Sequence, residues 1–144
     1  MTASEVPVRM MPELTDRSRH FWTGGEFGEL RILRCQDCGY YLHPPTSVCP
    51  KDQSRNVAPE AVSGRATVAT FTINHQRWAP TLEVPYAIAL VSLPEQPALR
   101  LTTNIVNCEL GEIHSGMEVQ VLFEHHTDAQ GDLWIPVFEP VKAA

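Results

Sequence analysis

The chain has 144 residues, of which 43% are apolar and 19% are charged, and its net charge is −6. This composition is that of one globular domain or of two very small units, and it excludes a disordered chain. The basic residues are scattered, so the sequence lacks the basic patch that nucleic-acid-binding proteins use to contact phosphates. We therefore expect no nucleic-acid partner.

No apolar run approaches the ~20 residues that a membrane-spanning helix needs. Residues Met1 to Met11 have neither the basic start nor the apolar core of a signal peptide. We therefore expect a cytoplasmic protein with no membrane partner. The spacing of the four cysteines agrees with this compartment, because it suits a metal site better than disulfides.

The N-terminal part is predicted to be a mobile lead-in over residues 1–12, followed by one short helix from Thr15 to Trp22. Thr15 is a candidate N-cap, because its hydroxyl can accept a hydrogen bond from a free backbone N–H of the first turn. Gly24 and Gly25 are expected to stop the helix.

Two large aromatic residues, Phe21 and Trp22, end this predicted helix. A short terminal helix cannot leave both rings in water, so something must cover them. Two interpretations stay open at this stage. The rings pack against the chain's own body, or they belong to the interface with a partner.

Residues 30–59 carry the pattern of a zinc ribbon. A strand over residues 30–34 leads into the knuckle Cys35-Gln-Asp-Cys38-Gly39, and residues 40–43 form the returning strand. A second knuckle follows at Cys49-Pro-Lys-Asp52. Each such turn points its ligands to one place, so two knuckles together make a closed structural site.

The second knuckle has Asp52 where a fourth cysteine would normally be. The ligands Cys35, Cys38 and Cys49 therefore need a different fourth partner for zinc. Asp52 is one candidate, because a carboxylate oxygen binds zinc at about 2.0–2.2 Å. His43 is a second candidate, and loss of the metal is the third interpretation.

From Gly64 onward, apolar and polar residues alternate with a period of two, which predicts β-strands. In the fourth segment, the apolar side chains alternate with polar ones that include Glu124. Residues 109–115, between the third and fourth segments, have room for one helical turn, and this layout is typical of an OB-fold barrel. The five expected strands cover residues 69–73, 86–93, 99–105, 117–124 and 133–137.

The predicted fold class is therefore mainly β. Residues 1–29 form a lead-in with a short helix, residues 30–59 a rubredoxin-like zinc ribbon, and residues 60–144 a five-stranded OB-fold barrel.

No residues in the sequence require a catalytic site. No nucleophile motif such as Gly-x-Ser-x-Gly and no Gly-rich phosphate loop is present. The pair His125-His126 is expected in a solvated turn, because adjacent strand residues point to opposite faces. Cys108 is expected to be a small buried apolar residue.

The loop between the first two barrel strands contains Arg77 and Trp78. OB-fold barrels often bind ligands with such loops, so Arg77 is a candidate contact to a phosphate and Trp78 a candidate for stacking. Trp134 alternates with the apolar residues of the last strand and is therefore expected to face outward, as part of an interface.

Several motifs together resemble the family of zinc-ribbon/OB-fold proteins, long labelled a domain of unknown function, that accompany thiolase-like enzymes. The resemblance runs from about residue 12 to the end, and the ribbon part is the more specific. The motifs are Phe21-Trp22, Gly28-Glu-Leu30, Arg34-Cys-Gln-Asp-Cys-Gly39, His43-Pro-Pro45, Cys49-Pro50, Ser54, Gly64, Thr70-Phe71 and Pro85-Tyr86.

This resemblance implies a non-catalytic accessory subunit of a thiolase or a sterol-carrier-protein-type thiolase or aldolase. Such complexes act on acyl-coenzyme A by retro-aldol cleavage of side chains such as those of steroids, or by thiolysis or condensation. The accessory chain would help form the acyl-CoA channel, with a structural zinc, in a hetero-tetramer. Phe21, Trp22 and Trp134 would then face the partner, and Arg77 and Trp78 the coenzyme. The alternatives are a single-stranded nucleic-acid-binding module and a stand-alone acyl-CoA-processing enzyme.

Overall fold

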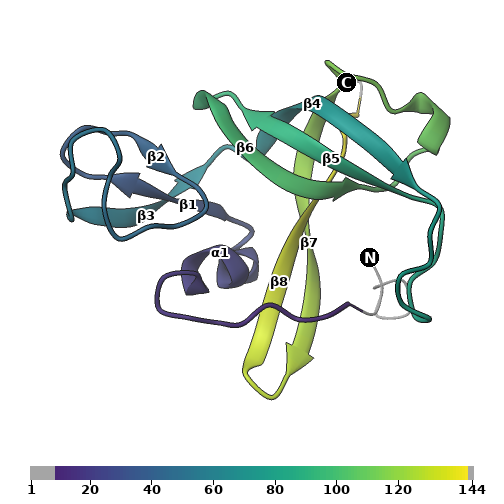
Figure 1. The fold of residues 1–144 in the computed structure, drawn as a ribbon, viewed down its shortest axis with the longest axis horizontal. Helices are drawn as coiled ribbons and strands as arrows, with labels where there is room; N and C mark the ends of the chain where they lie inside the picture. Colours follow the sequence, from purple (N-terminus) through teal and green to yellow (C-terminus); the bar gives the residue numbers. More distant parts are fainter. Residues whose placement is uncertain (1–8, 143–144) are drawn as a thin grey trace.

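The computed structural model describes residues 9–142, and it contains two β-structures and a short helix (Figure 1). A small three-stranded sheet stands beside a closed five-stranded barrel, and the helix α1 lies between them. The predicted mainly-β class, with a ribbon followed by a barrel, is confirmed. Residues 1–8 of the predicted lead-in lie outside the described part of the chain.

The helix α1 (Arg19–Thr23) is shorter than predicted. Thr15 still begins the turn that leads into it, because the Ser18 N–H donates to Thr15 Oγ1 (3.1 Å) and the Thr15 N–H donates to Ser18 Oγ (3.1 Å). After α1 the chain does not leave the helical path but tightens into the 3-10 helix η2 (Gly24–Phe27). Gly28, with φ of 69°, then turns the chain into the first strand.

The first strand divides its side chains between two cores. Leu30 and Ile32 are buried in the main core, whereas Leu33 and Cys35 belong to a second, smaller cluster inside the ribbon. One strand therefore links the packing of both units. The strand order is β2-β1-β3, with β1 (Leu30–Cys35), β2 (Tyr41–Leu42) and β3 (Val57–Val62).

The barrel closes in the order β4-β5-β6-β8-β7, with β7 returning to β4. The contact of β6 with β8 is parallel, and the other pairs are antiparallel. The short 3-10 helix η3 (Leu110–Glu112) lies between the third and fourth barrel strands, as predicted. The strands are β4 (Arg65–Asn74), β5 (Tyr86–Leu93), β6 (Gln96–Ile105), β7 (Glu118–Asp128) and β8 (Gly131–Pro140).

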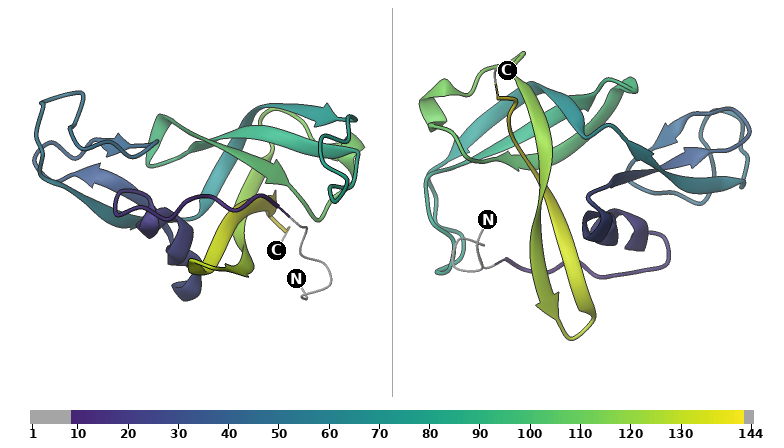
Figure 2. Two further views of the ribbon diagram at one scale, coloured as in Figure 1. Left: turned by 60° about the horizontal axis from the view of Figure 1, so that its bottom comes forward. Right: turned by 180° about the vertical axis from the view of Figure 1, so that it is seen from behind.

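Strands β7 and β8 form a hairpin that extends well beyond the barrel, as the views in Figure 2 show. The backbone of η2 packs against this hairpin at Trp134 and Phe123. A Cβ atom at Gly25 would lie 2.4 Å from Trp134 Cβ and 2.7 Å from the ring of Phe123, so only glycine permits this approach.

A glutamine side chain of the barrel forms two hydrogen bonds with the ribbon strand β2. Gln96 of β6 accepts a hydrogen bond from the Tyr41 N–H (2.9 Å) and donates one to the Tyr41 carbonyl (3.0 Å). Gln96 thus satisfies the backbone of β2 as a neighbouring strand would.

The N-terminal arm, residues 9–14, lies along the hairpin rather than hanging free. Arg9 pairs with Glu124 of β7, and Gln130 at the hairpin turn bonds the Leu14 N–H (2.8 Å) and the Pro12 carbonyl (3.0 Å). Residues 9–12 of the predicted mobile lead-in are therefore held by the fold. Within residues 9–142, no helix has the length and apolar character needed to span a bilayer.

Candidate metal centre and partner-facing residues

Two tight turns bring the four predicted metal ligands together at one end of the ribbon. In the first turn, the Gly39 N–H donates to the Cys35 carbonyl (2.9 Å), and in the second, the Gln53 N–H donates to the Cys49 carbonyl (2.9 Å). Gly39 and Gln53 both have positive φ angles, 83° and 61°, which close the turns. The residues brought together are Cys35, Cys38, Cys49 and Asp52.

The spacing of these ligand atoms fits a tetrahedral zinc ion. All four lie within 4.8 Å of one another. Zn–S bonds of about 2.3 Å and a Zn–O bond of about 2.1 Å imply S···S distances of about 3.8 Å and S···O distances of about 3.6 Å in a tetrahedral site. The structure has 3.6 Å between Cys38 Sγ and Cys49 Sγ, and 3.6 Å from Cys35 Sγ to each Asp52 oxygen. Three thiolates and one carboxylate are an acceptable donor set for zinc.

The ligand side chains differ in how readily they lose a proton in the absence of a metal ion. Burial raises the pKa of the Cys35 thiol, but hydrogen bonds from the Cys38 and Asp37 backbone and from the Cys38 and Cys49 side chains together lower it overall. The Tyr40 backbone N–H lowers the pKa of Cys38, but burial and the neighbouring Cys35, Cys49 and Asp52 outweigh it and raise that pKa to about 11. The Ser54 N–H donates to Asp52 Oδ1 (3.0 Å) and lowers the pKa of that carboxyl. A zinc ion held here would cross-link the two knuckles, which is a structural role.

The centre has a buried side and an exposed side. Cys35 and Cys49 are 1% and 0% exposed, whereas Cys38 and Asp52 face solvent. The buried pair belongs to the small ribbon core, whose other buried apolar residues within residues 9–142 are Leu33 and Leu42. Such a small core gives little stability by itself, so a metal cross-link suits this unit.

His43 does not join the metal ligands. Its ring packs on Phe21 with the centroids 4.8 Å apart. Its Nδ1 atom is buried and has no hydrogen-bond partner among the described residues. Burial and the neighbouring His20 lower its pKa to about 4. Of the two candidates for the fourth ligand, the structure therefore places Asp52, not His43, at the site.

The predicted ligand-binding pair lies in the loop after β4, at the end of the barrel far from the ribbon (Figure 1). Arg77 is exposed, and Trp78 is 75% exposed. The Trp78 indole N–H donates to Asn74 Oδ1 (3.3 Å), which fixes one edge of the ring and leaves most of its surface in solvent.

The predicted interface aromatics differ in exposure. Phe21 is buried in the main core and meets Trp22 edge-to-face, with the centroids 4.7 Å apart. Trp22 is half-buried. Trp134 is also half-buried, and its indole stacks on the His125 ring at 4.7 Å with the planes 11° apart. Phe21 thus packs against Trp22 from within the core, whereas Trp22 and Trp134 remain partly exposed to solvent.

The structure corrects two expectations about β7. His125 and His126 lie in the strand, not in a turn, although they do point to opposite faces. The alternation groups Glu124 with the polar residues of the strand, yet it is 1% exposed. The carboxylate is paired with Arg9 and lies 3.2 Å from His126 Nε2. Cys108 is half-buried and packs against the main core.

Two domain families match the chain in adjacent segments. The ChsH2 rubredoxin-like zinc ribbon domain matches residues 22–58, and the ChsH2 C-terminal OB-fold domain matches residues 59–124. Among solved structures, the Ltp2-ChsH2(DUF35) aldolase is similar with a TM-score of 0.78 and 30% identity, over 90% of this chain and 98% of that chain. The chain belongs to the DUF35 family. The predicted relationship to this family, and the zinc ribbon with its candidate site, are confirmed.

Two curated relatives illustrate the range of the DUF35 family. The 3-oxo-4,17-pregnadiene-20-carboxyl-CoA hydratase alpha subunit of Mycobacterium tuberculosis is 32% identical over 88% of this chain and 40% of that protein. A DUF35 domain-containing scaffold protein of Methanocaldococcus jannaschii is 33% identical over 63% of this chain and 64% of that protein. The chain spans about two fifths of the length of the hydratase alpha subunits that it matches.

Proposed function

We propose that this DUF35 protein is a non-catalytic accessory subunit of a thiolase-like aldolase that acts on acyl-CoA. One observation carries the proposal, namely the similarity in sequence and fold to the Ltp2-ChsH2(DUF35) aldolase along almost the whole of that DUF35 chain. The name of the mycobacterial relative adds a substrate class, because it is a steroid side-chain acyl-CoA. We therefore propose retro-aldol cleavage of a steroid-type side chain as the reaction of the complex, with the reacting groups on the partner.

The ribbon and the barrel would act as one rigid body toward the partner. The strand β1 contributes to both cores, and Gln96 fastens β2 to the barrel. Zinc at Cys35, Cys38, Cys49 and Asp52 would keep the ribbon end folded. This arrangement supports a scaffold role, because a scaffold has to hold its contact residues in fixed positions before binding.

We propose Trp22 and Trp134 as the contact residues for the partner, with Phe21 as the support of Trp22. Partly exposed tryptophans are enriched in binding hot spots, and both are held by ring contacts, to Phe21 and to His125. Alanine at either tryptophan should weaken assembly without unfolding the chain. Phe21→Ala should also lower the stability of the chain itself, because Phe21 belongs to its core.

For the coenzyme we propose the loop that holds Arg77 and Trp78. Trp78 is 75% exposed, and tryptophan and arginine are enriched in binding hot spots. The hydrogen bond to Asn74 leaves the indole face available for stacking on the adenine, and Arg77 is the neighbouring cation for a phosphate. In the complex this loop would border the acyl-CoA entrance of the partner.

Co-expression with the thiolase-like protein encoded nearest to this chain tests the proposal. We expect the two chains to co-purify, with a mass that fits two copies of each, and to cleave acyl-CoA substrates only together. Arg77→Gln should raise the KM for the acyl-CoA while the complex stays assembled, and Arg55→Gln, at an exposed arginine of the ribbon, is the matched control. Failure to co-purify, or turnover by the isolated chain, would contradict the accessory role.

A further inference from the structure

The metal centre carries its weakest ligand on its exposed side. Cys35 and Cys49 are buried in the ribbon core, whereas Cys38 and Asp52 face solvent. Soft thiolate sulfur suits zinc well, and a carboxylate oxygen is a harder and weaker ligand for it. The site therefore combines three thiolates with one oxygen ligand that molecules in the solvent can reach.

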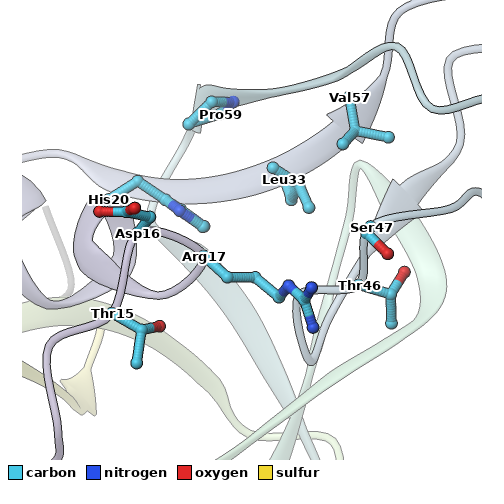
Figure 3. A pocket seen from close by; sticks show the side chains of 9 residues that line it. All are labelled: Thr15, Asp16, Arg17, His20, Leu33, Thr46, Ser47, Val57 and Pro59. Atoms are coloured by element: carbon cyan, nitrogen blue, oxygen red, sulfur yellow. The ribbon is translucent and has the colours of Figure 1, made fainter.

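The route to the metal position is direct from solvent. The ribbon also borders a groove beside the turn before α1, and Leu33 and Val57 line one wall of it (Figure 3). However, none of the four predicted metal ligands lines this groove, and Leu33 belongs to the core around the two buried cysteines. An external ligand would therefore approach the metal past Cys38 and Asp52 rather than through the groove.

Of the four ligands, Asp52 can leave the metal at the lowest cost. Its Oδ1 atom accepts a hydrogen bond from the Ser54 N–H (3.0 Å), and the exposed carboxylate can be hydrated. The two buried cysteines have no such access to water, and a buried charged group without a partner is costly. Cys38 is exposed like Asp52, but its thiolate is the better ligand for zinc.

We propose that Asp52 is an exchangeable ligand and that a small thiol can take its place at the metal. Asp52 would break its bond to the metal, the sulfur of the thiol would form the new bond, and the thiol proton would pass to the solvent. The free carboxylate would stay on the Ser54 N–H, and the three cysteines would keep the two knuckles cross-linked.

This exchange should be selective for sulfur over oxygen. An alcohol offers a neutral oxygen that is no better for zinc than the Asp52 carboxylate, whereas a thiol supplies the softer thiolate. Two probes of nearly equal size differ in this single atom, namely 2-mercaptoethanol and ethylene glycol. The thiol should therefore replace Asp52, and the glycol at the same concentration should not.

Cobalt in the zinc position makes the exchange visible, because each bond from thiolate to Co²⁺ adds charge-transfer absorption. The full chain is loaded with Co²⁺ without oxygen and titrated with each probe. With the thiol we expect a saturable rise of about one third in this absorption, from three cobalt–sulfur bonds to four, and with the glycol no change. The chain is used without a partner, so the result does not depend on the accessory role.

Two substitutions of Asp52 provide the controls. Asp52→Cys supplies the fourth thiolate from the chain itself, so its absorption should match that of the thiol-saturated wild type and should not rise further. Asp52→Ala leaves the position to solvent and should bind the thiol at a lower concentration than the wild type does.

Several results would overturn the proposal. If the wild type shows no rise at thiol concentrations on the order of tens of millimolar, Asp52 is a firmly held ligand. If the wild type instead loses its charge-transfer absorption, the thiol removes the metal and does not replace Asp52. An equal rise in Asp52→Cys would mean that the thiol binds elsewhere, and a chain that takes up no cobalt would refute the metal site as well.

Discussion

The ion pair between the N-terminal arm and the hairpin gives the sharpest prediction about stability. The Glu124 side chain is fully buried, and its two oxygens lie 2.6 Å from Arg9 Nε and 3.0 Å from Arg9 Nη2. His126 Nε2 is 3.2 Å from the first of these oxygens. The substitution Arg9→Met keeps the apolar stem but removes the charge, so the Glu124 carboxylate is left buried with His126 as its remaining side-chain partner.

The structure sets the size of this effect. Removal of one partner of a buried ion pair costs about 3–5 kcal/mol, because the other charge stays buried. Arg9 is 23% exposed, so water can reach part of the vacated space, and we expect a value at the low end, about 3 kcal/mol. Replacement of both residues, in Arg9→Met with Glu124→Leu, removes the buried charge as well. The double variant should therefore be more stable than Arg9→Met alone by about 2 kcal/mol.

Urea unfolding of the zinc-loaded protein, followed by tryptophan fluorescence, measures these free energies. Glu29→Gln is the matched control, because its ion pair with Arg31 is partly exposed at both side chains and should contribute under about 1 kcal/mol. The explanation is refuted if Arg9→Met costs no more than Glu29→Gln. It is also refuted if the double variant is less stable than Arg9→Met, since that result would mean that Glu124 stabilises the fold without its arginine.

Three further predictions concern the metal, the pH dependence and the packing of the helix. Asp52→Ala should lower the zinc content of the purified chain, and unchanged zinc would exclude Asp52 as an essential ligand. In the folded protein His43 has a pKa of about 4, against 6.5 for an unperturbed histidine, so the unfolded chain binds a proton more readily. The contribution of neutral His43 to the free energy of unfolding is therefore complete above about pH 6.5 and is lost as the pH falls toward 4. Unfolding free energies should therefore fall by about 2 kcal/mol more in the wild type than in His43→Gln between about pH 7.5 and pH 5, and equal slopes would contradict this. Gly25→Ala should cost about 2 kcal/mol, because its Cβ would lie 2.4 Å from Trp134 Cβ, while Gly111→Ala, with open space around it, should change the thermal midpoint little.

Local patterns in the sequence were sufficient for the features that depend on neighbouring residues. The alternation of apolar side chains predicts all five barrel strands, and β5 (Tyr86–Leu93) has the bounds expected from its apolar run. The spacing of Cys35, Cys38, Cys49 and Asp52 likewise predicts a cluster, because each knuckle is a turn of a few residues. The choice between Asp52 and His43 stayed open, since nothing within the ribbon sequence shows that the His43 ring packs against Phe21 of α1.

Contacts between distant segments explain what the sequence did not reveal. Alternation groups Glu124 with the polar residues of β7, but β7 continues past the barrel, and there the N-terminal arm covers this face of the hairpin. The covering residue, Arg9, lies 115 positions away in the chain, so no periodic pattern links the two. The helix α1 is shorter than predicted at its N-terminal end, because Thr15 and Ser18 bond each other's backbone N–H groups and hold residues 15–18 in a turn. Beyond its C-terminal end, the close contact of Gly25 with Trp134 and Phe123 accompanies the tighter 3-10 helix η2.

The position of β1 connects the metal centre to the rest of the molecule. Cys35 ends the strand whose first residue, Leu30, lies in the core shared with the barrel, and the six β1 residues pair in unbroken register with β3. The chain then passes from β3 through Gly64, whose Cβ position is filled by Val121 of the hairpin. Zinc at the knuckles would therefore stabilise one end of a continuous path that begins at the ligands and ends at the β7–β8 hairpin. In the proposed accessory role, this path would connect the metal centre to Trp134, the proposed contact residue on β8.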